Sequence, residues 1–227
     1  MICWICGKEG FTGEHLIKAS DLKSQFGQVS QDYPLYYHSG KKKNIPVGSL
    51  NSKRLKSNAL ICNSCNSSTT QPHDKAWEQL SSYLKSNITV YQKNNKIKLS
   101  KIFPGSVHRS MLYVHLYFLK IFGCIIVENK ASIPIGEISE SILKCKAHKN
   151  IYIAFGENPV KSKNNHAGYT PIHSVDMGNE SVFASWMYVT DNIAVNIIYA
   201  DEYKDQNVMR NTWHPSSIKK YLALKKY

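Results

Sequence analysis

Two Cys-x-x-Cys pairs constrain the fold of this chain more than any other feature of its sequence. They read Cys3-Trp4-Ile5-Cys6 and Cys62-Asn63-Ser64-Cys65, and 55 residues lie between them. A two-residue gap lets both thiolates of a pair reach one Zn²⁺, and two pairs complete a tetrahedral site. Redox-active motifs of this kind usually occur singly on a βαβ pattern, which the sequence lacks. The spacing therefore predicts structural zinc on Cys3, Cys6, Cys62 and Cys65, with redox chemistry or four free thiols as the alternatives.

The segment between the pairs has many glycine and proline residues and no long amphipathic pattern, so metal binding is expected to organise it. Farther along, periodicity predicts helices and strands. The helices are expected at about 16–26, 72–85, 106–124 and 134–145, a hairpin at 88–92 with 96–102, and strands at 150–155, 182–189 and 192–200. The predicted fold class is α+β, with a zinc-stabilised N-terminal domain (1–86) and a mixed α+β C-terminal domain (87–227).

The charge of the chain points to a polyanionic partner. Lys and Arg number 29 and Asp and Glu 16, a formal net charge of +13, and residues 81–130 carry 8 basic and 1 acidic side chains. Such an excess favours nucleic acid or an acidic membrane surface, while a solvated lysine-rich surface is the alternative. The 42% share of hydrophobic residues excludes a wholly disordered chain.

One apolar run, Met111 to Val127, is slightly short for a membrane span and contains Lys120, which would be costly in lipid. We therefore expect no membrane partner and read the 106–127 segment as a buried helix or as the contact surface of a homodimer. The N-terminus shows no basic region followed by an apolar run, so no secretory signal is expected. A cytoplasmic location is predicted, where paired cysteines are more often metal ligands than disulfides.

Three short segments accompany the cysteines and carry a family resemblance. The strings CWIC, GEHLI and NALICNSCN resemble the HNH endonucleases, the ββα-metal nucleases, in which zinc knuckles surround an acid–histidine pair and an Asn-Leu pair. In that family the second Cys-x-x-Cys is followed at once by His or Asn. The run TQPHDKAWEQL is similar to the tail of an HNH subgroup. The resemblance covers about residues 3–80 and implies a ββα unit there, whereas residues 100–227 resemble no family.

The residue types suit phosphodiester hydrolysis. His15 titrates near neutrality and can take a proton from water. Glu14 offers a carboxylate oxygen and Asn66 an amide oxygen to Mg²⁺ or Mn²⁺, which would stabilise the leaving 3′-oxygen. Successive residues of a strand face opposite sides, so a bend or bulge is needed for Glu14 and His15 to converge.

The resemblance assigns the remaining site residues. It implies that Asn58 orients the loop or ring of His15. Three features depart from the family pattern: the acid is Glu14 rather than the commoner Asp, Lys18 stands near the place of a proline that often follows the histidine, and the third position is Asn66 rather than His. His73 is a further candidate metal ligand or substrate contact, with a surface histidine as the alternative. Phosphate contacts are expected from the basic residues of the intervening loop: Lys41, Lys42, Lys43, Lys53, Arg54 and Lys56.

The sequence thus predicts a metal-dependent HNH endonuclease that hydrolyses DNA, with RNA as an alternative substrate. A role in restriction, phage defence or mobile elements is compatible with a basic protein of this kind. A zinc-dependent nucleic-acid-binding protein without catalytic activity is the competing hypothesis.

Overall fold

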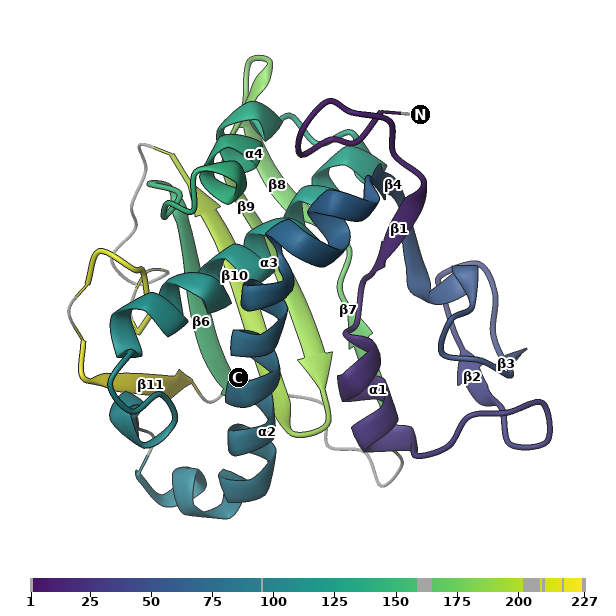
Figure 1. The fold of residues 1–227 in the computed structure, drawn as a ribbon, viewed down its shortest axis with the longest axis horizontal. Helices are drawn as coiled ribbons and strands as arrows, with labels where there is room; N and C mark the ends of the chain where they lie inside the picture. Colours follow the sequence, from purple (N-terminus) through teal and green to yellow (C-terminus); the bar gives the residue numbers. More distant parts are fainter. Residues whose placement is uncertain are drawn as a thin grey trace.

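The computed structural model describes residues 2–94, 96–158, 165–201, 209, 211–217 and 219–225. They form a mixed α+β structure (Figure 1). The α-helices are α1 (Ala19–Phe26), α2 (Gln71–Asn94), α3 (Val107–Asn129) and α4 (Ile135–Leu143). The shorter helical turns are η1 (Lys53–Leu55), η2 (Ser64–Thr69) and η3 (Leu99–Lys101). The strands are β1 (Thr12–His15), β2 (Leu35–Tyr37), β3 (Ile45–Val47), β4 (Lys56–Ile61), β5 (Lys96–Lys98), β6 (Ile151–Glu157), β7 (Ala167–Tyr169), β8 (His173–Met177), β9 (Glu180–Thr190), β10 (Ile193–Ala200) and β11 (Tyr221–Lys225).

Most of the strands belong to one seven-stranded sheet. Its order is β5-β11-β6-β10-β9-β7, with β8 also paired to β9. The β11–β6 pair is parallel and the other pairs are antiparallel. Two small ribbons stand outside the sheet: β1 pairs with β4, and β2 pairs with β3 at the edge of the molecule (Figure 1).

Helices α2 and α3 cover one face of the sheet (Figure 1). Their aromatic side chains meet the alternating inward residues of β9, where Tyr188 lies with its ring centroid 5.7 Å from Trp77 and 5.8 Å from Phe118. All three rings are fully buried. Rings of this size bury large apolar areas and prefer such edge-to-face contacts, so this cluster supplies much of the packing between the helices and the sheet.

The predicted apolar helix is confirmed as α3, and it is a core helix. It is long and apolar enough to cross a membrane, but 78% of its most apolar window is buried inside the protein, which is consistent with a soluble protein. The side chains from Val114 to Ile126 are all buried. Within the described structure, α3 therefore offers little apolar surface for the predicted homodimer contact.

Several other predicted helices and strands are present in the structure, although their ends lie at different residues than predicted. The helices at 72–85 and 134–145 correspond to α2 and α4, and the last two predicted strands are the β9–β10 hairpin. The predicted strand at 88–92 is wrong, because the backbone of α2 continues to Asn94. The β-branched run Ile88-Thr89-Val90 favours a strand only weakly, and extending a helix that has already formed adds one hydrogen bond per residue.

The two predicted domains share one core. Helix α2 runs through residues 86 and 87, and a single cluster of buried side chains includes Ile5 and Leu16 as well as Ile153 and Ile197. The division into folding units at 1–86 and 87–227 stays a prediction.

Asp21 in α1 is one of the polar links across this core. Its carboxylate is buried and accepts hydrogen bonds from Trp77 Nε1 at 2.9 Å, Ser81 Oγ at 3.0 Å and Tyr188 Oη at 2.6 Å. Lys85 adds an ion pair at 2.9 Å. A buried carboxylate is tolerated only with such partners, so Asp21 fixes α1 against both α2 and β9.

Three histidines form a second polar cluster, at the junction of α3 with the segment before β6. His115 Nε2 accepts a hydrogen bond from the backbone N–H of His148, and the His115 and His214 rings lie 5.5 Å apart. Glu137 Oε2 is 3.7 Å from His148 Nε2. Burial lowers the pKa of His148 to about 4 and holds the pKa of His115 well below its ordinary value. Both rings are therefore neutral at pH 7.

We expect the free energy of unfolding to fall as the pH is lowered from 6.5 toward 4. In that window the unfolded chain binds protons on His115 and His148 that the folded chain does not, so stability rises with pH. Each histidine is expected to lower the free energy of unfolding by about 1–2 kcal/mol at pH 5, relative to its value at neutral pH. Urea unfolding between pH 5 and 7.5 measures the effect.

Two variants make this test specific. His148→Gln removes one titrating group and should flatten the pH dependence between 5 and 6.5, whereas His173→Gln, on an exposed strand, should leave it unchanged. Equal unfolding free energies of the wild type at pH 5 and pH 7 would contradict the prediction.

Candidate functional site

The four predicted zinc ligands come together in the folded chain. The sulfur atoms of Cys3, Cys6, Cys62 and Cys65 all lie within 4.8 Å of one another, and Cys6 Sγ is 3.6 Å from Cys62 Sγ. Zinc with sulfur ligands at about 2.3 Å in a tetrahedron requires sulfur atoms about 3.8 Å apart. The backbone N–H of Cys65 points at Cys62 Sγ at 3.4 Å and helps to lower the pKa of that thiol to about 7. The spacing and the donors therefore fit a zinc ion.

The first knuckle is anchored on the core helix. Trp4 packs against Gly123 of α3 so closely that a Cβ atom at residue 123 would lie 2.2 Å from the indole ring. The backbone N–H of Trp4 also donates to Leu60 O, in β4, at 3.4 Å. The cysteine cluster thus sits where the beginning of β1, the end of β4 and α3 meet.

Between the knuckles, β1 and β4 form a short irregular ribbon. Gly13 pairs with Leu60 but His15 pairs with Lys56. Between these two pairs the register therefore advances two positions along β1 and four positions along β4. A Cβ atom at residue 13 would lie 2.2 Å from Ser57 O, so only glycine allows this approach of the two backbones. A register shift is present at this point, next to Glu14, but the described contacts of Glu14 and His15 are to different partners, Lys120 and Leu50.

The ring of His15 is oriented by a backbone carbonyl. His15 Nε2 lies 2.8 Å from Leu50 O, and since a carbonyl only accepts, this nitrogen carries the hydrogen. The other nitrogen, Nδ1, is then the basic one. Burial lowers the pKa of His15, the Leu50 carbonyl raises it, and the charge of Lys56 lowers it again, with a net downward shift. The ring is neutral at pH 7.

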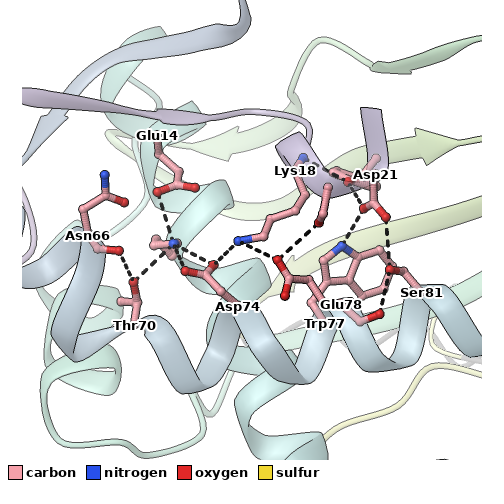
Figure 2. Close-up of polar contacts among 12 residues, drawn as sticks. Glu14, Lys18, Asp21, Asn66, Thr70, Asp74, Trp77, Glu78 and Ser81 are labelled. Carbon is pink, nitrogen blue, oxygen red and sulfur yellow. Dashed lines mark hydrogen bonds and ion pairs between the residues drawn. The ribbon is translucent and has the colours of Figure 1, made fainter. Parts of the chain in front are cut away.

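Glu14 points to a different environment, inside the protein. Its side chain is 6% exposed, and its Oε2 lies 3.1 Å from Nζ of Lys120, which is fully buried. The same ammonium contacts Asp74 Oδ1 at 2.9 Å and Thr70 Oγ1 at 3.2 Å. Figure 2 shows these contacts meeting at one nitrogen. We call Lys120, Glu14, Asp74 and Thr70 the Lys120 network.

The carboxylates decide the charge state of Lys120. Burial alone would lower its pKa, but Glu14 and Asp74 outweigh that effect and raise the pKa above its ordinary value. Lys18 extends the chain of charges, with its Nζ 3.3 Å from Asp74 and 3.5 Å from Glu78 (Figure 2). The buried ammonium is therefore charged and fully partnered.

The two asparagines of the motif have separate contacts. Asn66 lies in η2, and its Nδ2 donates to Thr12 Oγ1 at 3.2 Å, so the amide faces the beginning of β1. Asn58 is exposed, and its Nδ2 donates to Glu128 Oε1 at 2.9 Å. The contacts that the structure describes for Asn58 thus link β4 to the end of α3, and none of them reaches His15.

His73 lies between two helices. It is 2% exposed, and its ring is 5.4 Å from the ring of Tyr113 in α3. Burial, followed by the charge of Lys120, lowers its pKa to about 4. The surface alternative for His73 is wrong. Within the described ranges, the four cysteines are the one group of three or more His, Cys, Asp or Glu side chains close enough to share an ion.

Three of the basic residues predicted to grip phosphates lie at the His15 end of the ribbon. Lys56 lies opposite His15 in the β1–β4 ladder, and Lys53 and Arg54 directly precede it in η1. Lys41 to Lys43 occupy the loop between β2 and β3. All are exposed except Lys56, which is partly exposed, so their charges can reach a polyanion.

Sequence reasoning missed two features of this site. Lys120 was considered only as a lysine unsuited to lipid, although a lone lysine within an apolar helix is itself a signal for a buried acidic partner. The Leu50 carbonyl carries no side-chain signal, so the sequence could not have indicated it. No family model, no curated protein and no solved structure matches this chain.

Removing one zinc ligand is expected to abolish zinc binding and destabilise the fold. In Cys62→Ser the ion loses a thiolate and the two knuckles separate. We expect a melting temperature lower by roughly 10 °C or more, since a loss of 1 kcal/mol corresponds to roughly 2–4 °C at this chain length. Zinc content by elemental analysis and thermal unfolding measure the two effects. Cys145→Ser is the control, because Cys145 is exposed and outside the cluster; a zinc content independent of Cys62 would contradict the assignment.

Removing the ammonium from the Lys120 network is expected to be strongly destabilising. Lys120→Met leaves the buried carboxylate of Glu14 without a cation, while the partly buried Asp74 keeps its ion pair with Lys18, at a cost of about 3–5 kcal/mol. The cost should be larger at pH 8 than at pH 5, because acid neutralises a buried carboxylate that has lost its cation. Urea unfolding at both pH values tests this, with Lys144→Met as the control, because that lysine forms an exposed pair with Glu140. A Lys120→Met protein as stable as the wild type at pH 8 would refute the expectation.

Proposed function

We propose that the protein is a metal-dependent endonuclease of the HNH type that hydrolyses phosphodiester bonds of DNA. The observation that carries the proposal is the state of His15. Its ring is anchored through Nε2 on Leu50 O, which makes Nδ1 the basic nitrogen, and its lowered pKa keeps it neutral at pH 7. A neutral imidazole with one nitrogen fixed by a hydrogen bond has the properties required of a general base.

The surroundings of His15 support this proposal. An antiparallel β1–β4 pair is followed directly by η2 and α2, in the order that a ββα unit requires, and the cysteine cluster joins its ends. The exposed basic residues near His15 would hold a phosphate backbone beside the ring. In the proposed nuclease, a base and a phosphate-binding surface would then lie at the same end of the ribbon.

In the proposed reaction, Nδ1 of His15 takes a proton from a water molecule. The water oxygen forms a bond to phosphorus, and the bond from phosphorus to the 3′-oxygen breaks. A Mg²⁺ or Mn²⁺ ion would stabilise the negative charge on that leaving oxygen. Lys56 and Lys18 assist by disfavouring the protonated ring before the reaction begins.

Glu14 and Asn66 are the residues that would hold the divalent ion. Asn66 donates through Nδ2 to Thr12, which leaves its Oδ1 as the metal-binding atom. Glu14 contacts Lys120 through Oε2, so Oε1 would be the ligand. One carboxylate together with water and phosphate oxygens is a usual environment for Mg²⁺, so the donor set fits. Asn58 would act on β4 through Glu128, and His73 would support the helix pair rather than bind the ion.

The second candidate is a zinc-dependent nucleic-acid-binding protein without catalytic activity. The contact between Glu14 and Lys120 favours it, because that carboxylate already has a buried cation as its partner. The cysteine cluster and the basic surface would serve this function equally well. The two candidates differ in one respect, which is whether bound nucleic acid is cut.

Plasmid nicking in the presence of Mg²⁺ or Mn²⁺ distinguishes the candidates. We expect the zinc-loaded wild type to nick, and His15→Ala to lose at least about 100-fold in rate, which is the usual contribution of a general base. His173→Ala is the control, since it removes an exposed imidazole far along the chain.

Gel-shift measurements on the same samples complete this test. Binding by both wild type and His15→Ala without any nicking would establish the non-catalytic candidate instead. Nicking that survives the loss of His15 would refute the mechanism. Matched DNA and RNA substrates then decide which polymer is cut.

A further inference from the structure

A cavity next to the His15 end of the ribbon has the lining of a nucleobase site. It has a volume of about 430 Å³ and lies between α1, the β2–β3 hairpin, η1 and the β7 segment. This volume is within the roughly 300–1,000 Å³ that small-molecule sites occupy. The backbone connects it to the candidate active site, because Leu16, the residue after His15, donates its N–H to the carbonyl of Leu55 in the cavity wall.

Phenylalanine and tyrosine rings line part of this cavity, together with aliphatic side chains. Tyr36 and Tyr37 come from β2, Tyr169 from β7 and Phe26 from the end of α1. Tyr36 and Tyr169 remain 59% and 39% exposed, so part of each ring is accessible to solvent. Aromatic faces that remain accessible in a cavity can stack on the bases of unpaired nucleotides.

The polar part of the lining suits a nucleotide as well. Arg54 is the charged side chain at the wall, and none of the described lining residues is acidic. The loop from Lys41 to Lys43 begins directly after the lining residues Ser39 and Gly40. A base could therefore enter the aromatic cavity while its phosphates stay on the basic rim, where Arg can also stack on a base.

The phenol groups of Tyr37, from β2, and Tyr169, from β7, are close neighbours in the cavity lining. Burial raises the pKa of Tyr169, and the side chain of Tyr37 raises it further. Tyr169 therefore stays protonated and can act as a hydrogen-bond donor at pH 7. Together with the Asn129 amide in the same lining, the cavity has donors and acceptors for the edge of a base.

We propose that this cavity, between the β2–β3 hairpin and β7, binds an unpaired nucleotide of single-stranded DNA next to His15. The inference rests on the proposed function and names its substrate class: a strand with at least one base free to leave the stack. Base pairs in an intact duplex keep their faces stacked, so a duplex would reach the basic rim but not the aromatic walls.

Equilibrium binding tests the inference without depending on cleavage. The probe is a short fluorescein-labelled oligothymidylate, compared with a labelled duplex of the same length, in the His15→Ala background at physiological salt without divalent ions. Fluorescence anisotropy gives both affinities. We expect tighter binding of the single strand, and a loss of roughly 5- to 100-fold for that probe alone in Tyr36→Ala, as stacking contributions of this kind predict.

Two further variants test whether the aromatic ring at position 36 is the cause of the single-strand affinity. Tyr36→Trp keeps an aromatic face and should retain single-strand affinity. Tyr221→Ala removes a half-exposed ring on β11, outside the lining, and should change neither affinity. Because Tyr36 is largely exposed, the melting temperature of Tyr36→Ala should match that of the parent protein.

Each outcome separates this inference from the proposed function. Equal affinity for both probes, or a loss in Tyr36→Ala that is the same for single strand and duplex, overturns the inference and leaves the nuclease proposal intact. Selective loss of single-strand binding, in a protein whose wild type never nicks DNA, supports the cavity and removes the catalytic claim. Binding to neither probe refutes both.

Discussion

The ammonium of Lys120 lies where β1, α2 and α3 meet, and its acidic partners come from the first two of these elements. Glu14 and Asp74 both contact it, and Thr70 adds a hydrogen bond from the beginning of α2. A charge at this depth is tolerated only when opposite charges and hydrogen bonds replace water. The geometry of all three elements is therefore coupled, because a displacement of any one leaves a buried charge without a partner. The orientation of β1, and with it the position of His15, depends on this contact.

The cysteine cluster acts on the other end of the same ribbon. Zinc on the four sulfurs would join the segments before β1 and after β4, while Trp4 packs on α3 beside Gly123. With zinc bound, the ribbon would be held at one end by the metal, and the Lys120 network holds the other end. Between them, the close approach at Gly13 accommodates the irregular register that separates the environments of Glu14 and His15. A ribbon this short would have little stability without both constraints.

The sequence was sufficient to predict those features that depend on short-range spacing. Two-residue gaps between cysteines and the 3.6-residue pattern of α3 indicated a four-cysteine cluster and a core helix, and the structure brings the four cysteines together and buries the helix. The extent of α2 was not predictable, because Ile88 to Val90 have strand propensity that a preceding helix overrides. The contacts of Glu14, Asn58 and His73 were also missed. Each of them involves a residue of α3 (Lys120, Glu128 and Tyr113), and nothing in residues 1–80 indicates which later helix will cover the ribbon.

The position of Glu14 has a consequence for metal binding in the proposed nuclease. A divalent ion on its Oε1 would lie close to the ammonium on Oε2, and like charges only a few ångströms apart in a partly dry site repel strongly. Such an ion would bind weakly to the protein alone and more strongly once a DNA phosphate adds negative charge and oxygen ligands. The basic surface would then have two effects of opposite sign, since it attracts the phosphate and disfavours the free cation. In the proposed nuclease, Lys120 would thereby favour assembly of the catalytic site on bound substrate, and the same contact that stabilises the ribbon would limit metal binding in the absence of substrate.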